Sequence, residues 1–256
     1  MNKLKLITEG QKSAFCFVSI APLRAEAKDS SEMVSQILFG EPVEITGFGF
    51  PWLKIRTLLD GYEGFADSKH FLAISTKEVQ RWLDEKQYLS TPFSNLTGPN
   101  GKQLLSKGSL VGFSDFNIGP YDFHLDLSND TTKTIWQHAM EYHNTPYLWG
   151  GKSIFGIDCS GLTQAVYRLF DINLPRDAYQ QEEIGTSIEI EESQANDLAF
   201  FSNEKGRIIH VGIIGSDNRI IHASGRVRID KLTKDGIWNE DYETRTHQLH
   251  SIKRVI

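Results

Sequence analysis

Short apolar runs separated by turn-forming residues make up the first half of the chain, and helical spacing appears only after it. Between about residues 12 and 128 the runs are rich in β-branched and aromatic side chains, with clusters of Gly, Pro and Asp between them. This pattern is typical of small all-β barrels. The runs after about residue 76 are weaker than those before it. We therefore predict two small β modules, over residues 1–75 and 76–128.

The pattern changes after the turn-forming residues 128–130. A helix is predicted from Thr131 to Asn144, because apolar positions recur there with helical spacing and Thr131 or Thr132 can serve as the N-cap. A Gly-rich loop follows, and the apolar residues of the segment 160–170 recur at i, i+3, i+4 and i+7. This second helix is therefore expected to face a hydrophobic core.

Three apolar runs further along the chain have the composition of strands, at residues 197–202, 207–215 and 219–225. The last two flank Ser216-Asp217-Asn218, residues that are typical of turns, and so they predict an antiparallel hairpin. Helices come first and strands after them, which indicates an α+β domain over residues 129–256.

Composition narrows the classes of partner. Among 256 residues, 33 acidic side chains outnumber 27 basic ones and the net charge is −6, so the basic stripe of a nucleic-acid-binding protein is missing and no nucleic acid is expected as a partner. Apolar residues at 39% and aromatic residues at 11% are enough to build packed cores. Two cysteines are too few for a disulfide framework or a four-thiolate zinc site.

The N-terminal segment lacks the apolar core of a signal peptide, because Glu9 interrupts its longest uncharged stretch. No apolar run approaches the roughly 18 residues that span a bilayer. We therefore expect a soluble, cytoplasmic protein that contacts no membrane, or a periplasmic one if a native signal has been removed.

Cys159 lies between a glycine-bearing loop and the first turn of the second predicted helix. Free N–H groups and the helix dipole place partial positive charge there, which is expected to lower the thiol pKa and favour the nucleophilic thiolate. The alternative is a small buried hydrophobic residue, the usual role of a free cysteine. Cys16 lies in an apolar strand and is assigned to a core.

His210 and His222 lie on the two arms of the predicted hairpin. A loop centred on residue 216 would place them directly opposite each other and on one face of the sheet. His210 could then act as general base for the thiol of Cys159, with His222 fixing its tautomer. The same three residues could instead bind a metal ion, but catalytic zinc sites of that composition usually add a closely spaced second cysteine, so no metal is expected. The other histidines are interpreted as surface or packing residues: His70, His124, His138, His143, His247 and His250.

The third domain resembles the NlpC/p60 superfamily of papain-like cysteine peptidases. The motifs that carry the resemblance are, in chain order, YLWGG, GIDCSGL, LPRDAYQQ, NDLAFF, IIHVGI and IIHAS. Upstream, LRAEAKDSSEMVSQILFGEPVEI and DGYEGF resemble the bacterial SH3-like modules that precede this catalytic domain in relatives that cleave murein tripeptides. The fold class implied is an α+β papain-like catalytic domain preceded by two small all-β SH3-like barrels.

The resemblance implies a cysteine endopeptidase that hydrolyses the γ-D-glutamyl-diamino acid bond of murein peptides with a free N-terminal L-Ala. We expect the protein to be a monomer and to need no cofactor. Cys159 matches the family's nucleophile, His210 its base and His222 its third residue. The positions that match the family's ammonium-binding groups are Asp158, Ser160, Asp177, Tyr62 and Glu32. A buried ammonium needs such carboxylate partners, so intact glycan-linked peptidoglycan would be excluded.

Several of these positions could instead have a purely structural role. Asp158 can serve only as an N-cap, Asp177 as a turn residue and Tyr62 as a barrel aromatic. Ala178 stands where some relatives carry a hydroxyl group. The oxyanion is expected to bind the backbone N–H of Cys159, with Tyr62 as a candidate second donor. The alternative functions are a peptidoglycan-binding adaptor with a non-catalytic third domain, and acyl transfer or amide hydrolysis on another substrate.

Overall fold

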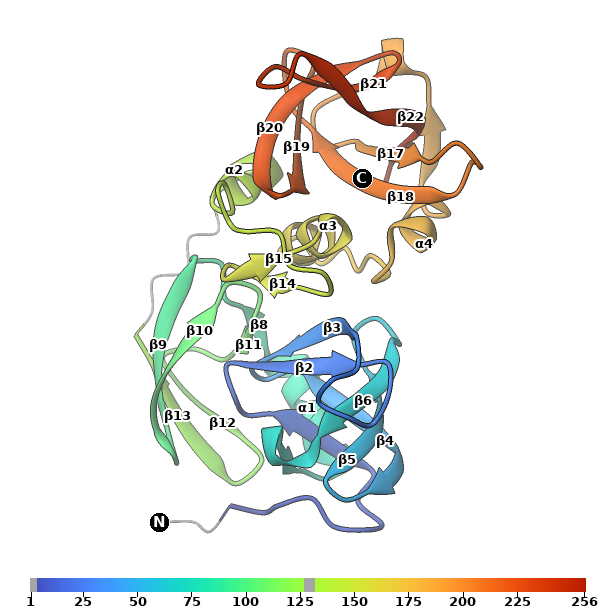
Figure 1. Ribbon diagram of the computed structural model, residues 1–256. Coiled ribbons are helices and arrows are strands. Elements are labelled where there is room, and N and C mark those ends of the chain that lie inside the picture. Colours follow the sequence, from blue (N-terminus) through green and yellow to red (C-terminus); the bar gives the residue numbers. More distant parts are fainter. Residues whose placement is uncertain (1–3, 127–131) are drawn as a thin grey trace. The chain divides into compact units, whose positions relative to one another are not determined.

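The computed structural model describes residues 4–126 and 132–256. The chain divides into two compact units, one comprising Met1–Thr131 with Lys152–Ile154 and the other comprising Thr132–Gly151 with Phe155–Ile256 (Figure 1). The predicted boundary at residues 128–130 and the predicted N-cap Thr131 lie outside the described residues.

The first unit is built mainly of antiparallel strands. Its elements are β1 (Ser13–Cys16), β2 (Ile20–Arg24), β3 (Met33–Leu38), β4 (Pro42–Gly49), β5 (Trp52–Thr57), β6 (Glu63–Asp67), the 3-10 helix η1 (Ser68–His70), β7 (Phe71–Ala73), α1 (Thr76–Glu85), β8 (Gln87–Tyr88), β9 (Phe93–Gly98), β10 (Gly101–Ser106), β11 (Leu110–Val111), β12 (Asp115–Ile118), β13 (Tyr121–Leu125) and β14 (Lys152–Ser153).

Strands β1 to β7 form a seven-stranded sheet in the order β3-β2-β6-β5-β4-β1-β7, and β9, β10, β12 and β13 form a four-stranded sheet. Burial alternates along β5, where Leu53 and Ile55 are buried while Lys54 and Arg56 are exposed. This two-residue period turns one face of the strand towards the core and the other towards water.

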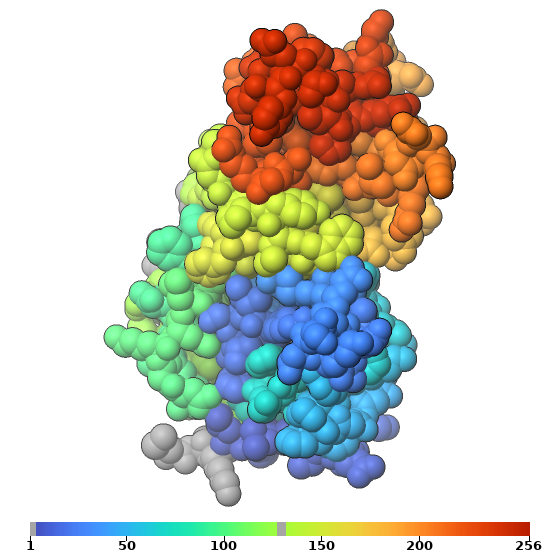
Figure 2. Space-filling view, in the orientation of Figure 1, coloured from blue at the N-terminus to red at the C-terminus, as the bar shows by residue number. Residues whose placement is uncertain are grey.

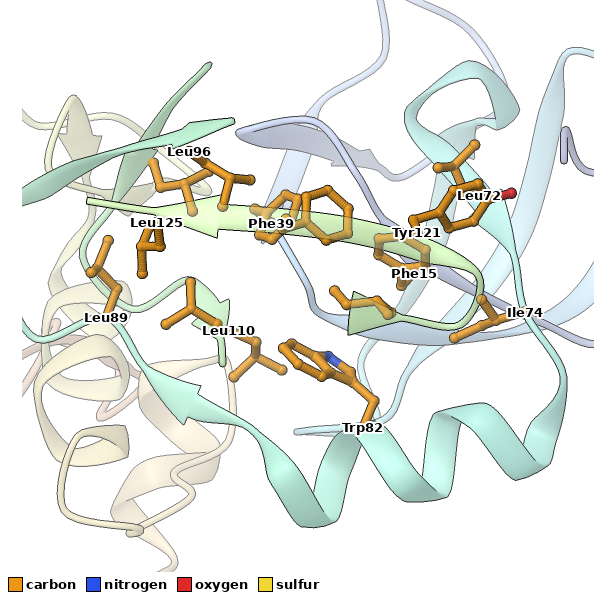
Figure 3. Close-up of a cluster of buried hydrophobic side chains, with 14 of the residues drawn as sticks. Phe15, Phe39, Leu72, Ile74, Trp82, Leu89, Leu96, Leu110, Tyr121 and Leu125 are labelled. Atoms are coloured by element: carbon orange, nitrogen blue, oxygen red, sulfur yellow. The ribbon is translucent and has the colours of Figure 1, made fainter. Parts of the chain in front are cut away.

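One hydrophobic cluster joins both predicted β modules. Phe15, Phe39 and Leu72 from the first module pack with Trp82 and Tyr121 from the second (Figure 3). The two segments thus share a core. The division at residue 76 into two modules stays a prediction.

The prediction of strands alone over residues 76–128 was wrong, because α1 begins there. Its N-terminus carries a capping box in which Ser75 accepts from the backbone of Glu78 and the Glu78 side chain accepts from Ser75. Val79 and Trp82, three residues apart, are its buried side chains. With so few apolar positions on a polar ten-residue segment, the helical period was weak in the sequence.

The second unit has helices first and a sheet after them, as predicted. Its elements are α2 (Ile135–Met140), β15 (Gly156–Ile157), α3 (Cys159–Arg168), α4 (Ala178–Glu182), β16 (Thr186–Ile188), the 3-10 helix η2 (Ile190–Glu192), β17 (Leu198–Ser202), β18 (Ile208–Ile214), β19 (Arg219–Ser224), β20 (Arg226–Thr233), β21 (Gly236–Asn239) and β22 (Thr244–Arg254). The predicted helix from Thr131 to Asn144 is shorter than expected, and its N-cap is Thr134.

Strands β16 to β22 form one sheet in the order β16-β22-β17-β18-β19-β20-β21, and an additional pairing of β21 with β22 closes six of them into a ring. Figure 2 shows the atoms of this sheet, in orange and red, packed together as one continuous mass. Helix α3 packs against β18 and β19. All ten residues of α3 are buried, as expected for a helix that faces a core.

Candidate active site

Cys159 is the first residue of α3. Asp158 is the N-cap, and its carboxylate accepts a hydrogen bond of 2.7 Å from the backbone N–H of Gly161. An added Cβ at Gly161 would overlap with the carbonyl oxygen of Gly151. The glycine therefore lets the start of the helix lie directly against the loop that precedes it.

The thiol of Cys159 lies beside β18. The backbone of Ser160 and the backbone of Val211, which follows His210 in the strand, both lower the pKa of this thiol. The structure thus brings the sulfur to the strand that carries the predicted base.

The expected lowering of the Cys159 pKa is wrong. Burial raises the pKa of this thiol to about 12, and the nearby carboxylate of Asp158 contributes to the rise. The two backbone N–H groups and Arg176 lower the pKa, but by less than burial raises it. The side chain is 7% exposed, so desolvation of the thiolate outweighs the helix N-terminus. The resting thiol is neutral and requires a base.

His210 and His222 meet, but not in the expected register. Strand β18 pairs with β19 so that Gly212, not His210, lies opposite His222. The turn is centred on Asp217, where both Asp217 and Asn218 have positive φ. A shift of two residues keeps both histidines on one face of the sheet, and His210 Nε2 lies 2.8 Å from His222 Nδ1.

A third strand extends this pair. His222 Nε2 lies 2.9 Å from Oδ2 of Asp230, and Asp230 forms an ion pair with Arg228. Burial raises the pKa of Asp230, but hydrogen bonds from His222 and Arg228 outweigh it and the net pKa is lowered, so the carboxylate is ionised. The sequence analysis did not identify Asp230 as a site residue, because β20 lies beyond the hairpin that the motifs define.

The hydrogen bonds assign the tautomers of both histidines. An ionised Asp230 can only accept, so neutral His222 carries its proton on Nε2 and leaves Nδ1 as an acceptor. His210 then donates from Nε2, which leaves its Nδ1 unprotonated. Burial lowers the pKa of His210 well below its usual range, and the rings of His222 and His247 lower it further. His210 is therefore a neutral base at rest.

Two further side chains belong to this region. His247, one of the six histidines interpreted as surface or packing residues, stacks on His210 with ring centroids 4.1 Å apart. Burial raises the pKa of Tyr147, and the neighbouring Cys159 and Asp158 raise it further, so its hydroxyl keeps its proton. Tyr147 stands in the YLWGG motif, the one signal in the sequence that could have indicated it.

Asp158 and Ser160 are brought together by a buried arginine. Arg176 Nη1 and Nη2 lie 3.0 and 2.6 Å from the two carboxylate oxygens of Asp158, and Nη1 also donates to Ser160 Oγ at 2.9 Å. The backbone N–H of Gly150 donates to the same carboxylate. The charge of Asp158 is therefore already compensated within the protein.

The remaining predicted substrate-binding residues belong to other elements of the fold. Asp177 is the half-buried N-cap of α4, and its backbone N–H donates to Gln180 Oε1 at 3.2 Å. Tyr62 and Glu32 belong to the first unit, where Tyr62 precedes β6 and Glu32 precedes β3 and is exposed. Their part in binding substrate stays a prediction.

Across residues 4–126 and 132–256, no group of three or more His, Cys, Asp and Glu side chains could hold a metal ion. In the same described ranges no helix is both long and apolar enough to cross a bilayer.

Comparison with known proteins identifies the family. Residues 144–246 match the model of the NlpC/P60 family. "Probable endopeptidase NlpC" of Escherichia coli is 34% identical over 142 residues, which cover 54% of this chain and 92% of that protein. The chain therefore belongs to the NlpC/P60 family, and the resemblance noted in the sequence is confirmed.

Two other matches extend over more of the chain. "Gamma-D-glutamyl-L-lysine dipeptidyl-peptidase" of Bacillus subtilis is 28% identical over 215 residues, covering 74% of this chain and 71% of that protein. A solved NlpC/P60 family structure from Bacillus cereus has a TM-score of 0.75 at 19% identity and covers 95% of this chain and 99% of its own. The fold is thus shared along nearly the whole chain.

Proposed function

We propose that the protein is a cysteine endopeptidase that hydrolyses the γ-D-glutamyl-diamino acid bond of murein peptides with a free N-terminal L-Ala. The observation that carries the proposal is the arrangement of Cys159, His210 and His222, with the thiol at a helix start beside the strand of a neutral histidine. The relative from Bacillus subtilis, named for the γ-D-glutamyl-L-lysine bond, supports the choice of bond.

The first chemical step is attack by the sulfur of Cys159 on the γ-carbonyl carbon of D-Glu. Since the thiol is neutral at rest, His210 Nδ1 takes its proton as the S–C bond forms. His210 then gives this proton to the nitrogen of the leaving diamino acid, and the C–N bond breaks to leave a thioester. Water, deprotonated by His210, hydrolyses the thioester and restores the thiol.

The tetrahedral oxyanion needs donors that are already in place. The backbone N–H of Cys159, at the start of α3, is one donor in our proposal. We assign the second donor to the hydroxyl of Tyr147, because Tyr147 interacts with Cys159 within the same unit and keeps its proton. Tyr62 stays the alternative that the sequence predicts for this role.

Selection of the free amino terminus is the second part of the proposal. A substrate ammonium is held by carboxylates, and we assign Asp158, Ser160 and Asp177 with Tyr62 and Glu32 to this pocket. We further assign the second unit to the papain-like class and the β-rich first unit to SH3-like modules.

The test uses the peptide L-Ala-γ-D-Glu-L-Lys. Cys159→Ala should abolish its hydrolysis, whereas Cys16→Ala, which changes the other buried thiol in a core, should retain it. Acetylation of the substrate's amino group should nearly abolish cleavage by the unchanged protein. Cleavage by the Cys159→Ala variant would overturn the mechanism, and equal cleavage of the acetylated peptide would overturn the ammonium pocket. Binding to purified sacculi without release of peptides would favour the adaptor.

A further inference from the structure

We propose that Asp230 is a positioning residue that holds His222 in the tautomer on which the basicity of His210 depends. The inference rests on the proposed function, because it concerns the same thiol and base. It adds a fourth member, from a third strand, to the three residues that the motifs identify.

The geometry follows from the pairing of three neighbouring strands. His222 in β19 lies opposite Gly212 in β18 and opposite Arg228 in β20. His210 and Asp230 each lie two residues from those partners, so all three side chains share one face of the sheet. The two hydrogen bonds, 2.8 Å from His210 to His222 and 2.9 Å from His222 to Asp230, therefore run diagonally across the strands.

Asp230 acts only as a hydrogen-bond acceptor, because its carboxylate is ionised. Arg228 Nη2 donates to Asp230 Oδ1 at 2.8 Å and Arg228 Nε lies 2.7 Å from Oδ2, which favours the ionised carboxylate. Asp230 is 6% exposed and His222 is 1% exposed, so water does not replace their hydrogen bond. An acceptor fixed at this place keeps the His222 proton on Nε2.

The tautomer of His222 determines the tautomer of His210, and so determines which nitrogen of His210 can accept the thiol proton. With its proton on Nε2, His222 offers Nδ1 only as an acceptor, and His210 must donate from Nε2. Nδ1 of His210 is then free for the thiol proton. If His222 carried its proton on Nδ1 instead, it would oppose the donor on His210 and favour the tautomer whose Nδ1 is occupied.

Charge acts in the same direction. When His210 takes the thiol proton, a positive charge appears on a buried ring, and the carboxylate of Asp230 stabilises it through His222. The other groups that face the relay are Arg228, which is paired with Asp230 and Asp241, and His247, whose ring stacks on His210. Burial lowers the pKa of His247 to about 4, so this ring adds no charge near neutral pH.

Asp230→Asn is the variant that tests the role, because an amide can donate as well as accept and so permits the wrong tautomer. We expect kcat to fall on the order of 10²-fold or more, with a smaller change in KM, and the acidic limb of the kcat-pH profile to shift. Asp230→Glu should recover most of kcat, since the carboxylate is kept.

Asp217→Asn is the matched control. It makes the same chemical change in the exposed turn of the β18–β19 hairpin, outside the hydrogen-bonded relay. Its kcat and pH profile should equal those of the unchanged protein. If Asp230→Asn merely loosened the fold, its melting temperature would fall while its kcat-pH profile remained that of the control, and the inference would be overturned.

A second readout needs no peptide substrate. In the full-length Cys159→Ala variant labelled with ¹⁵N-histidine, we expect the Nδ1 resonance of His222 to be that of an unprotonated nitrogen, and Asp230→Asn to move it towards the protonated position. Absence of peptide cleavage by the unchanged protein would count against the proposed function alone. An unchanged His222 resonance in Asp230→Asn would count against the positioning role alone.

Discussion

Replacing Arg176 by Met should strongly destabilise the second unit. The guanidinium is 2% exposed and makes two contacts, of 3.0 and 2.6 Å, with the carboxylate of Asp158. Removing one partner of a buried ion pair leaves an uncompensated charge and costs about 3–5 kcal/mol. Asp158 keeps hydrogen bonds from the backbone N–H groups of Gly150 and Gly161, so we expect a loss of about 3 kcal/mol, the lower end of this range.

The two cysteines of the chain allow this loss to be assigned to one unit. Cys16 is buried in the first unit and Cys159 in the second. Burial raises the pKa of both thiols, so a short pulse of iodoacetamide should label each thiol much more slowly while its unit is folded than after it unfolds. Pulse labelling along a urea titration, read by mass spectrometry of the two cysteine-containing peptides, gives a separate unfolding midpoint for each thiol.

The Arg176→Met variant should shift the midpoint at Cys159. Asp158→Asn in the same chain should recover much of the loss, because it removes the stranded charge while its side-chain oxygen can still cap α3. A loss below about 1 kcal/mol at Cys159, or no recovery in the double variant, would refute the conclusion that Arg176 compensates a buried carboxylate.

Three other outcomes are expected from the same labelling experiment. Gly161→Ala should destabilise the second unit by about 1–3 kcal/mol, because the added methyl group would overlap with the backbone of Gly151; an unchanged Cys159 midpoint would contradict this. Ser75→Ala removes the N-cap of α1 and should cost about 1 kcal/mol at Cys16, with the exposed Lys77→Ala as the neighbouring control. The stability at Cys159 should fall as the pH drops from about 6.5 towards 4. The folded-state pKa of His247 is lowered to about 4, so the unfolded chain binds its proton first and protonation favours unfolding; stability independent of pH in this window would contradict the shift.

Local patterns in the sequence predicted the elements that carry the thiol and the two histidines. Cys159 begins a helix because a capping carboxylate and a close-packed glycine flank it, and both are visible in the motif itself. The hairpin of His210 and His222 was predicted in kind, but its register was not, since it depends on the positive φ values of Asp217 and Asn218.

Residues that reach the site from elsewhere in the chain could not be predicted. Asp230 and His247 come from strands beyond the hairpin, and only the order of strands in the sheet reveals that they lie beside His222 and His210. The pKa of Cys159 was predicted in the wrong direction for a related reason. The helix N-terminus is a local feature, whereas the burial that outweighs it is produced by the whole fold.

Gly151 and Gly161 have a consequence for how relatives of this protein are recognised. Both lie where backbone touches backbone, and an added Cβ at either would overlap with a carbonyl oxygen. These glycines of the motif around the thiol are therefore required for close packing of the backbone, and they take no part in bond cleavage. A chain could keep these glycines, and with them its likeness to the family, after losing Cys159 or His210. Family membership and catalytic competence depend on different residues, and only the second set indicates whether a new member is an enzyme.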